Sequence, residues 1–328
     1  AAMEGEVVGN LTYPRGAACR PRTCRLCCVT RESRLRREAS VLRELADGVY
    51  IYTGYEDVNS GLILTQRGGL LVDTPLVPSE TREWKSALPG LGATNIYGIV
   101  NTDYHPEHFF GNAVFMPTRT WGNELSTKPI TKYETSGLDQ ISSRYREQDP
   151  DLAKEIATMQ IYRPEICVED QVTLYLGDRR VEILHLEGHT PASLGVYLPK
   201  ERILFAGDNV VDNRHPAAYH TNSLAWLDTL ARIRDLEVDL IVPGEGEPCG
   251  KEAIAPLIEY ITEMRKRTEE LFLRGASRRQ AVEKVDMLDW FPFTEEQAAA
   301  IRRRRRESVE RIYAEIRISH RKQKHRGR

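Results

Sequence analysis

Short apolar runs in the middle of the chain alternate with polar stretches rich in Gly, Pro, Asp and Asn, and this pattern predicts a mixed α/β domain. The runs are too short for buried helices and are rich in Val, Ile, Leu and Tyr, which favours strands. We predict strands over residues 48–55, 61–73 as a hairpin, 96–100, 171–177, 179–186, 193–199, 202–208 and 238–244.

Helical spacing of apolar residues appears between and after these strands. It predicts helices over 79–88 and 224–236, and two or three long helices after Lys251. Residues 117–164 have helical and loop character without a strand, as expected for a lid. We therefore divide the chain into an extension at 1–40, a domain at 41–250 with a helical lid at about 117–164, and C-terminal helices with a basic tail at 251–328.

Composition is that of an ordinary globular protein. The 328 residues are 41% hydrophobic, enough to bury a full core. The net charge of −2 is uneven, because residues 1–40 hold eight arginines and the stretch after Ile301 holds twelve Lys and Arg residues. Neither a long apolar span nor a secretory signal pattern is present, so we expect a cytoplasmic protein that does not enter the membrane.

Four of the six cysteines crowd into residues 19–28. Their spacing is compatible with a metal clip, but no distant pair of cysteines completes one. We interpret residues 1–40 as a disordered extension instead.

Polar clusters follow four of the predicted strands. They are "DYHPEH" at 103–108, "GHTPAS" at 188–193, "AGDN" at 206–209 and "PGEG" at 243–246. Side chains delivered from several strand ends to one edge are a common way of building a rigid site. Because these side chains are His, Asp and Glu, the pattern points to a metal centre.

The same four clusters resemble the metallo-β-lactamase-fold superfamily across roughly Val41 to Ile318. That family's motifs are H-x-H-x-D-H after a strand, then Gly-His-Thr, Gly-Asp and Pro-Gly-His-Gly. This chain keeps His105, His108, His189 and Asp208, but Asp103, Glu107 and Glu245 replace the first His, the Asp and the last His. The resemblance implies a four-layered αββα sandwich, here with added C-terminal helices.

The resemblance also implies two metal ions per chain. Asp103, His105 and His189 would hold one ion, and Glu107, His108 and Glu245 the other, with Asp208 bridging the two. A decayed site without metal is the alternative, although all three replacements are themselves metal-binding groups. Four carboxylates where the family has two favour iron or manganese, with zinc possible.

For function, this arrangement implies a hydrolase in which metal-activated water attacks a small ester, lactone, amide or ether-like substrate. Glu107 and Asp208 are the candidate catalytic carboxylates, and Glu107 either binds a metal or accepts a proton beside the water. His215 and His220 follow the Asp208 strand and are candidate substrate contacts.

Two other functional classes stay open. One is a di-iron oxidoreductase or oxygenase, resembling the carboxylate-containing sites of flavodiiron proteins, and the other is a metal-free binding protein. The basic C-terminal helix has a partial apolar stripe, which favours a packed or dimer-forming helix over nucleic-acid binding. We therefore expect a small-molecule substrate and a homodimer through the C-terminal helices.

Overall fold

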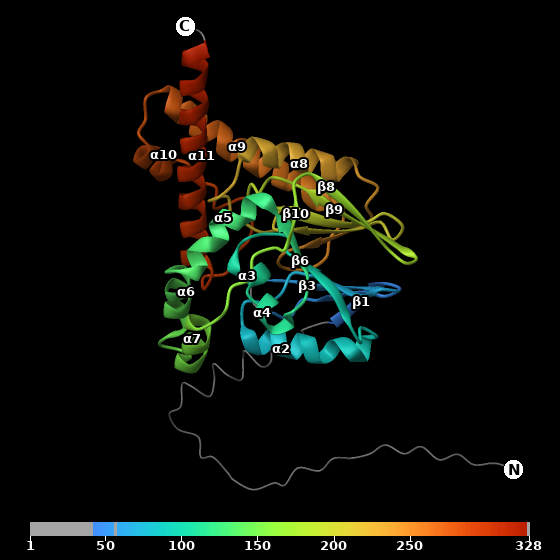
Figure 1. The fold of residues 1–328 in the computed structure, drawn as a ribbon. Coiled ribbons are helices and arrows are strands. Elements are labelled where there is room, and N and C mark those ends of the chain that lie inside the picture. The colour runs from blue at the N-terminus through green and yellow to red at the C-terminus, as the bar shows by residue number, and fades with distance from the viewer. Residues whose placement is uncertain (1–41, 56–57, 327–328) are drawn as a thin grey trace, which may run out of the picture. The chain divides into compact units, whose positions relative to one another are not determined.

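The computed structural model describes residues 42–55 and 58–326. The predicted extension at 1–40 and its four cysteines lie outside these residues. All predicted strands are present in the described part of the chain, together with three that were not predicted, and they form two sheets (Figure 1).

The first sheet has seven strands in chain order. They are β1 (Leu42–Ala46), β2 (Val49–Tyr52), β3 (Ser60–Thr65), β4 (Gly68–Val72), β5 (Ile96–Val100), β6 (Thr120–Asn123) and β7 (Ile166–Val168). Strands β1 to β4 are antiparallel neighbours, whereas β4 to β7 run parallel to one another. Parallel strands end at the same edge, so the loops after β4 and β5 meet there.

The second sheet has five strands in the order β12-β11-β10-β9-β8. They are β8 (Gln171–Leu176), β9 (Arg179–His185), β10 (Leu194–Leu198), β11 (Ile203–Gly207) and β12 (Leu240–Pro243). Strand β10 is antiparallel to both β9 and β11, and β12 is parallel to β11. The carboxyl ends of β9, β11 and β12 therefore share one edge.

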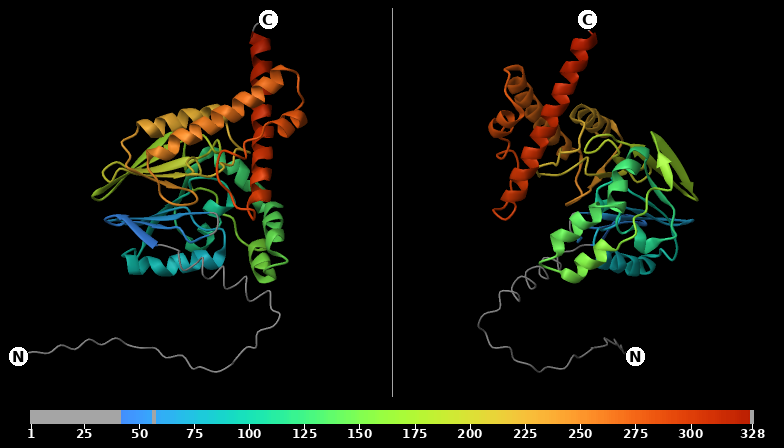
Figure 2. Two further views of the ribbon diagram at one scale, coloured as in Figure 1. Left: turned by 180° about the vertical axis from the view of Figure 1, so that it is seen from behind. Right: turned by 60° about the vertical axis from the view of Figure 1, so that its left-hand side comes forward.

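Alternating side chains explain why the two sheets stack. On β3, Ile63 packs in the cluster between the sheets, while its neighbour Leu62 points to the opposite face and packs with Trp84 of the covering helix. On β11, Phe205 faces the first sheet and Leu204 faces the helices. This period of two buries both faces of each sheet and produces helix, sheet, sheet and helix layers (Figures 1 and 2). The predicted αββα sandwich with added C-terminal helices is confirmed.

Helix α2 covers the first sheet, and α8 and α9 cover the second (Figure 1). The α-helices are α2 (Pro78–Ala87), α3 (Pro106–Phe109), α4 (Asn112–Phe115), α5 (Thr127–Ile130), α6 (Gly137–Tyr145), α7 (Pro150–Ala157), α8 (Ser223–Asp235), α9 (Ile254–Leu273), α10 (Arg278–Lys284) and α11 (Ala298–Arg326). Short 3-10 helices occupy Leu88–Leu91, Glu124–Ser126, Thr131–Glu134 and Lys251–Ala253.

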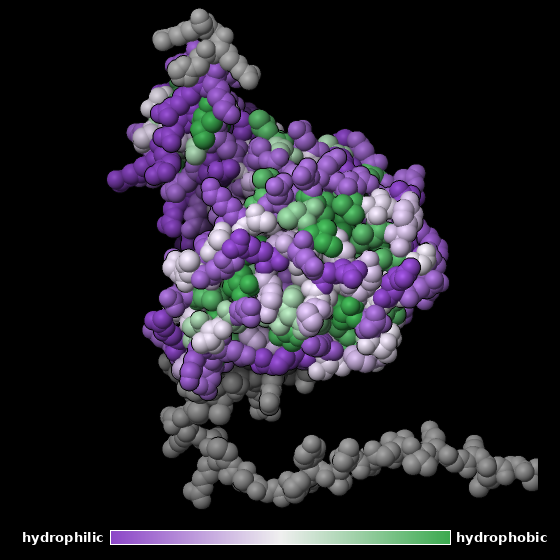
Figure 3. All heavy atoms as spheres, in the orientation of Figure 1, coloured by the Kyte–Doolittle hydropathy of each residue, from purple (hydrophilic) through white to green (hydrophobic). Residues whose placement is uncertain are grey.

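The apolar stripe of the C-terminal helices packs inside the chain itself. Ile254, Leu257 and Ile261 of α9 and Val309 and Ile312 of α11 belong to one buried cluster with the second sheet. Hydrophilic residues cover most of the visible surface of α11 (Figure 3). Because the stripe is used within the chain, it gives no support to the homodimer, which stays a prediction.

The interpretation of residues 117–164 as a segment without strands is wrong in one place. Residues Thr120–Asn123 form β6, which pairs in parallel with β5 and β7 and is buried along its whole length. The remainder consists of short helices, as predicted. Among the described residues, no helix combines the length and apolarity needed to cross a membrane.

Candidate metal centre

Four strand ends bring the candidate ligands to one edge of the sandwich. Asp73 follows β4 and Asp103 follows β5 in the first sheet, while His189 follows β9 and Asp208 follows β11 in the second. All four are buried or nearly so. The site therefore lies where the two sheets meet, and its side chains are held by strands rather than by free loops.

The structure brings the three residues of the first predicted metal site together. Ligand atoms of Asp103, His105 and His189 lie within 4.8 Å of one another, and all three side chains are buried. His105 Nδ1 is 3.5 Å from Asp103 Oδ1 and 3.2 Å from His189 Nε2. Burial and the neighbouring histidines His189 and His220 lower the pKa of His105 well below its ordinary value, which keeps the ring neutral and able to bind a cation.

Asp103 differs from the other members of this group because protein donors already surround it. Its Oδ1 accepts the backbone N–H groups of Tyr104 at 2.6 Å and His105 at 3.1 Å. Its Oδ2 accepts the hydroxyls of Thr190 at 3.1 Å and Ser193 at 3.2 Å. Four donors match the four lone pairs of a carboxylate, so a metal at Asp103 would compete with a hydroxyl. These bonds also tie the β5 end to the loop after β9.

Asp208 lies between two histidines. Its Oδ2 is 3.6 Å from both His108 Nε2 and His189 Nε2. Burial would raise the pKa of Asp208, but His108 and then His189 outweigh it and hold the pKa below its usual value. A carboxylate that stays ionised between two imidazoles is in the position predicted for a bridging ligand.

Sequence reasoning missed Asp73, which fixes the orientation of His108. Asp73 Oδ2 lies 2.9 Å from His108 Nδ1, and the same carboxylate accepts the backbone N–H and the hydroxyl of Thr102. Burial lowers the pKa of His108, but Asp73 and Asp208 outweigh burial and raise it well above its ordinary value. Holding Nδ1 in this way turns Nε2 toward Asp208, as carboxylates beside metal-binding histidines commonly do. The signal in the sequence was one more apolar strand ending in Asp, "GLLVD".

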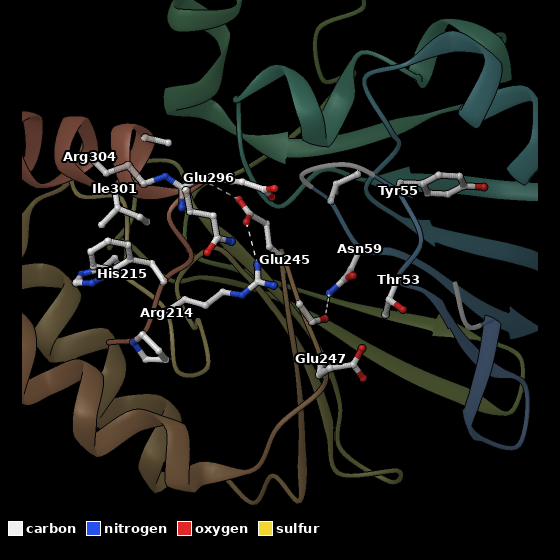
Figure 4. A pocket seen from close by; sticks show the side chains of 16 residues that line it. Thr53, Tyr55, Asn59, Arg214, His215, Glu245, Glu247, Glu296, Ile301 and Arg304 are labelled. Atoms are coloured by element: carbon white, nitrogen blue, oxygen red, sulfur yellow. Dashed lines mark hydrogen bonds and ion pairs between the residues drawn. The ribbon is translucent and has the colours of Figure 1, made fainter. Parts of the chain in front are cut away.

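Glu107 and Glu245 lie in different surroundings. Glu107 belongs to a second group with His105 and Asp208, whose ligand atoms also lie within 4.8 Å of one another. Glu245 is in neither group; instead Arg214 Nη1 is 3.3 Å from one of its oxygens and Arg304 Nη2 is 3.6 Å from the other (Figure 4). The second predicted metal site is therefore only partly assembled around Asp208.

The two histidines predicted to contact substrate lie in different surroundings. His220 is half-buried, lines the same cavity as Glu107, and its Nδ1 is 2.7 Å from His105 Nε2. His215 is 3% exposed, and its ring nitrogens contact the Phe291 carbonyl at 3.0 Å and the Tyr260 hydroxyl at 3.5 Å. Those contacts are typical of a packed core histidine, although its ring also borders a neighbouring cavity of about 630 Å³ (Figure 4).

A cavity of about 380 Å³ opens over the centre. His105, Glu107, Asp208 and His220 line it together with Ile141 of the predicted lid. Its other charged residues are Lys132, Arg144, Glu245, Arg303, Arg304 and Glu307. The two arginines from α11 were not predicted, because that basic segment was expected to be a solvated helix face.

Three buried atoms of the centre lack a hydrogen-bond partner within the described part of the chain. They are His108 Nε2, His189 Nδ1 and Asp208 Oδ1. An unpartnered buried polar group costs about 1–3 kcal/mol. His108 Nε2 faces Asp208 and therefore indicates a missing ligand at the centre, whereas His189 turns Nε2 rather than Nδ1 toward the centre. Imidazole nitrogens and carboxylate oxygens are ligands of Zn²⁺, Mn²⁺ and Fe²⁺, so the donor set fits a metal ion.

Comparison with known proteins identifies the family. The sequence profile of the metallo-beta-lactamase superfamily matches residues 53–245, more than half of the chain. The protein therefore belongs to the metallo-beta-lactamase superfamily, and the predicted resemblance is confirmed.

Two curated relatives of this chain have names that describe different enzymes. The chain is 24% identical over 179 residues to a type 2 metallo-beta-lactamase of Pseudomonas aeruginosa, covering 51% of this chain and 61% of that enzyme. It is 23% identical over 262 residues to a linear primary-alkylsulfatase of a Pseudomonas species, covering 69% of this chain and 49% of that protein. The chain thus spans less than two-thirds of the length of either relative.

Solved structures agree on the fold. The inverting sec-alkylsulfatase Pisa1 from Pseudomonas sp. matches 86% of this chain and 51% of its own, with a TM-score of 0.63 and 15% identity. A metallo-beta-lactamase family protein from Thermus thermophilus matches 83% of this chain and 93% of its own, with a TM-score of 0.61 and 20% identity. Each match covers a larger share of this chain than residues 1–250 make up. Each therefore includes part of the C-terminal helices.

Proposed function

We propose that this protein is a dinuclear metal-dependent hydrolase of small, negatively charged esters. The observation that carries the proposal is the buried cluster of His and Asp with unpartnered atoms at the base of a cavity. One ion would be held by Asp103, His105 and His189. His105 has one lone pair to offer, so the second ion would be held by Glu107 and Asp208 with His108, whose Nε2 is 3.6 Å from Asp208 Oδ2. The metal-free alternative would leave these buried atoms without bonds at a cost to stability.

Bound metal ions would supply a Lewis acid and a water of lowered pKa. In the chain itself, Asp73 holds His108, and Asp208 stays ionised between His108 and His189. Glu107 lies beside His105 and Asp208 at the cavity wall, where it binds a metal or accepts the proton of the attacking water.

The cationic side chains of the cavity support an anionic substrate. Lys132, Arg144, Arg303 and Arg304 line it together with four carboxylates, Glu107, Asp208, Glu245 and Glu307. Because bound metal ions would offset Glu107 and Asp208, the four cations would outnumber the two remaining carboxylates, and guanidinium groups suit sulfate, phosphate and carboxylate oxygens. Two of these arginines come from α11, and the matches that include C-terminal helices contain an alkylsulfatase. A sulfate monoester of a simple alcohol is therefore the first substrate to test.

The structure also changes the argument on metal identity. Glu245 is compensated by Arg214 and Arg304, so three carboxylates, Asp103, Glu107 and Asp208, remain as candidate metal ligands. Three still exceed the family's usual two, so we keep iron or manganese as the first expectation and zinc as the alternative.

The test combines elemental analysis with a substrate panel. Protein produced with iron, manganese and zinc supplied should hold about two ions per chain, as a dinuclear site requires. Decyl sulfate, the neutral ester decyl acetate, a lactone and a β-lactam are then compared, and decyl sulfate should give the highest kcat/KM. Absence of all three metals would contradict the proposal, and a preference for the neutral ester would contradict the anionic substrate.

A further inference from the structure

His220 extends the metal centre by one more imidazole. It lies in the segment between β11 and α8, and its Nδ1 is 2.7 Å from His105 Nε2. The other nitrogen of His105, Nδ1, is 3.2 Å from His189 Nε2. The rings of His105 and His220 are 5.0 Å apart at an interplanar angle of 31°. Three imidazoles therefore form a chain from the buried centre to the cavity.

If His105 binds a metal through Nδ1, its contact of 2.7 Å with His220 determines where the protons of both rings must lie. A hydrogen bond between two imidazoles needs one N–H and one lone pair. The nitrogen of His105 that faces Asp103 and His189 is Nδ1, and it needs its lone pair to bind a cation. In a neutral ring the proton is then on Nε2, which donates to Nδ1 of His220. His220 in turn carries its own proton on Nε2.

The outer nitrogen of His220 is available to a ligand. The ring lines the catalytic cavity, and Nε2 has no hydrogen-bond partner among the described residues. This nitrogen is not buried, so the cavity reaches it. An N–H group at this place faces the same space as the cationic side chains.

We propose that His220 is a positioning residue of the metal centre that also binds substrate. Through Nδ1 it holds His105 in the tautomer that presents its own Nδ1 to a metal. Through Nε2–H it donates a hydrogen bond to an anionic oxygen of the substrate. The second role rests on the proposed function, whereas the first requires only that the centre binds metal.

Two variants separate these roles. His220→Phe removes both nitrogens but keeps a ring of similar size. His220→Asn keeps an acceptor oxygen near the position of Nδ1 and provides no donor at the position of Nε2. His320→Phe is the matched control, because it makes the same change on the distant part of α11, where His320 pairs with Glu269.

The first readout is metal retention by the purified holoprotein in a chelator. We expect His220→Phe to weaken retention of one ion about 10- to 100-fold, as removal of a partner of a metal-binding histidine typically does. His220→Asn and His320→Phe should retain metal like the wild type. With Co²⁺ as the probe, the absorption spectrum should change in the Phe variant and not in the Asn variant. Equal retention in all four proteins, or equal loss in the Phe and Asn variants, would overturn the positioning role.

The second readout is hydrolysis of decyl sulfate by the metal-loaded proteins. His220→Asn should raise KM with its metal content unchanged, because a donor to the anionic group is lost. An unchanged KM would overturn the substrate contact. A wild-type protein without metal would overturn the proposed function as well, whereas metal-loaded, active wild type with insensitive variants overturns this inference alone.

Discussion

Glu107 and Glu245 replace family ligands in the sequence, yet their environments differ. Glu107 stands in α3 with its carboxylate near His105 and Asp208. Glu245 forms ion pairs with Arg214 and Arg304, one at each carboxylate oxygen. A carboxylate compensated by two guanidinium groups is a weaker metal ligand, because binding a cation requires those contacts to be given up. The geometry therefore favours Glu107 as the ligand and Glu245 as a neutralising group between the arginines.

Matched substitutions test this difference. Glu107→Gln should lower the metal content of the purified protein by about one ion per chain, since a neutral amide is a much poorer ligand than a carboxylate. Glu245→Gln should keep the wild-type metal content. Elemental analysis of both variants provides the measurement. The reverse order of loss would restore the original prediction that Glu245 completes the second metal site.

At the scale of the element, the loop after β12 controls how closely the backbone approaches the centre. Asn59 holds this loop through its side-chain N–H groups, which donate to the carbonyls of Pro243 at 2.9 Å and Gly246 at 2.8 Å. A Cβ added to Gly244 would lie only 1.9 Å from Oδ1 of Asp208. The loop can pass this carboxylate only because Gly244 has no side chain.

Gly244→Ala should therefore displace Asp208 and reduce metal content while the sandwich stays folded. The control is Gly90→Ala, because a Cβ there meets nothing within 4 Å. We expect the Gly244 variant to lose at least half of its bound metal and the control to lose none, on the principle that a ligand displaced by about 1 Å no longer fits the ion. Wild-type metal content in Gly244→Ala would show that Asp208 is not needed where the structure places it.

The sequence predicted those elements that are determined by their own residues and missed those that depend on contacts with distant residues. Apolar runs bounded by turn residues predicted most strands, because the apolar composition of a strand indicates that it is buried. Strand β6, "TWGN", has no such run, and its conformation comes from pairing with β5 and β7. Asp73 was visible as an Asp at a strand end, but its contact with His108 joins residues 35 positions apart. The same holds for Arg303 and Arg304, which reach the cavity only through the packing of α11.

For the whole molecule, the metal centre is also a connection between the two sheets. His105 and His108 lie at the start of helix α3 and within it, directly after β5 of the first sheet, while His189 and Asp208 follow strands of the second. These side chains are close together only in the folded protein. An ion that needs all of them binds the folded protein and not the unfolded chain, so it stabilises the fold. At a concentration about 1,000 times its dissociation constant, the contribution is about 4 kcal/mol.

Removing the metal should therefore lower the melting temperature of the entire sandwich. With a shift of about 2–4 °C per kcal/mol for a chain of this size, a strong chelator should lower Tm by about 10 °C. Asp208→Asn removes the ligand between His108 and His189, so its Tm should respond far less to the chelator. Gly90→Ala should keep the full response. Differential scanning calorimetry with and without chelator makes the comparison, and a wild-type Tm that ignores the chelator would mean that no metal joins the sheets.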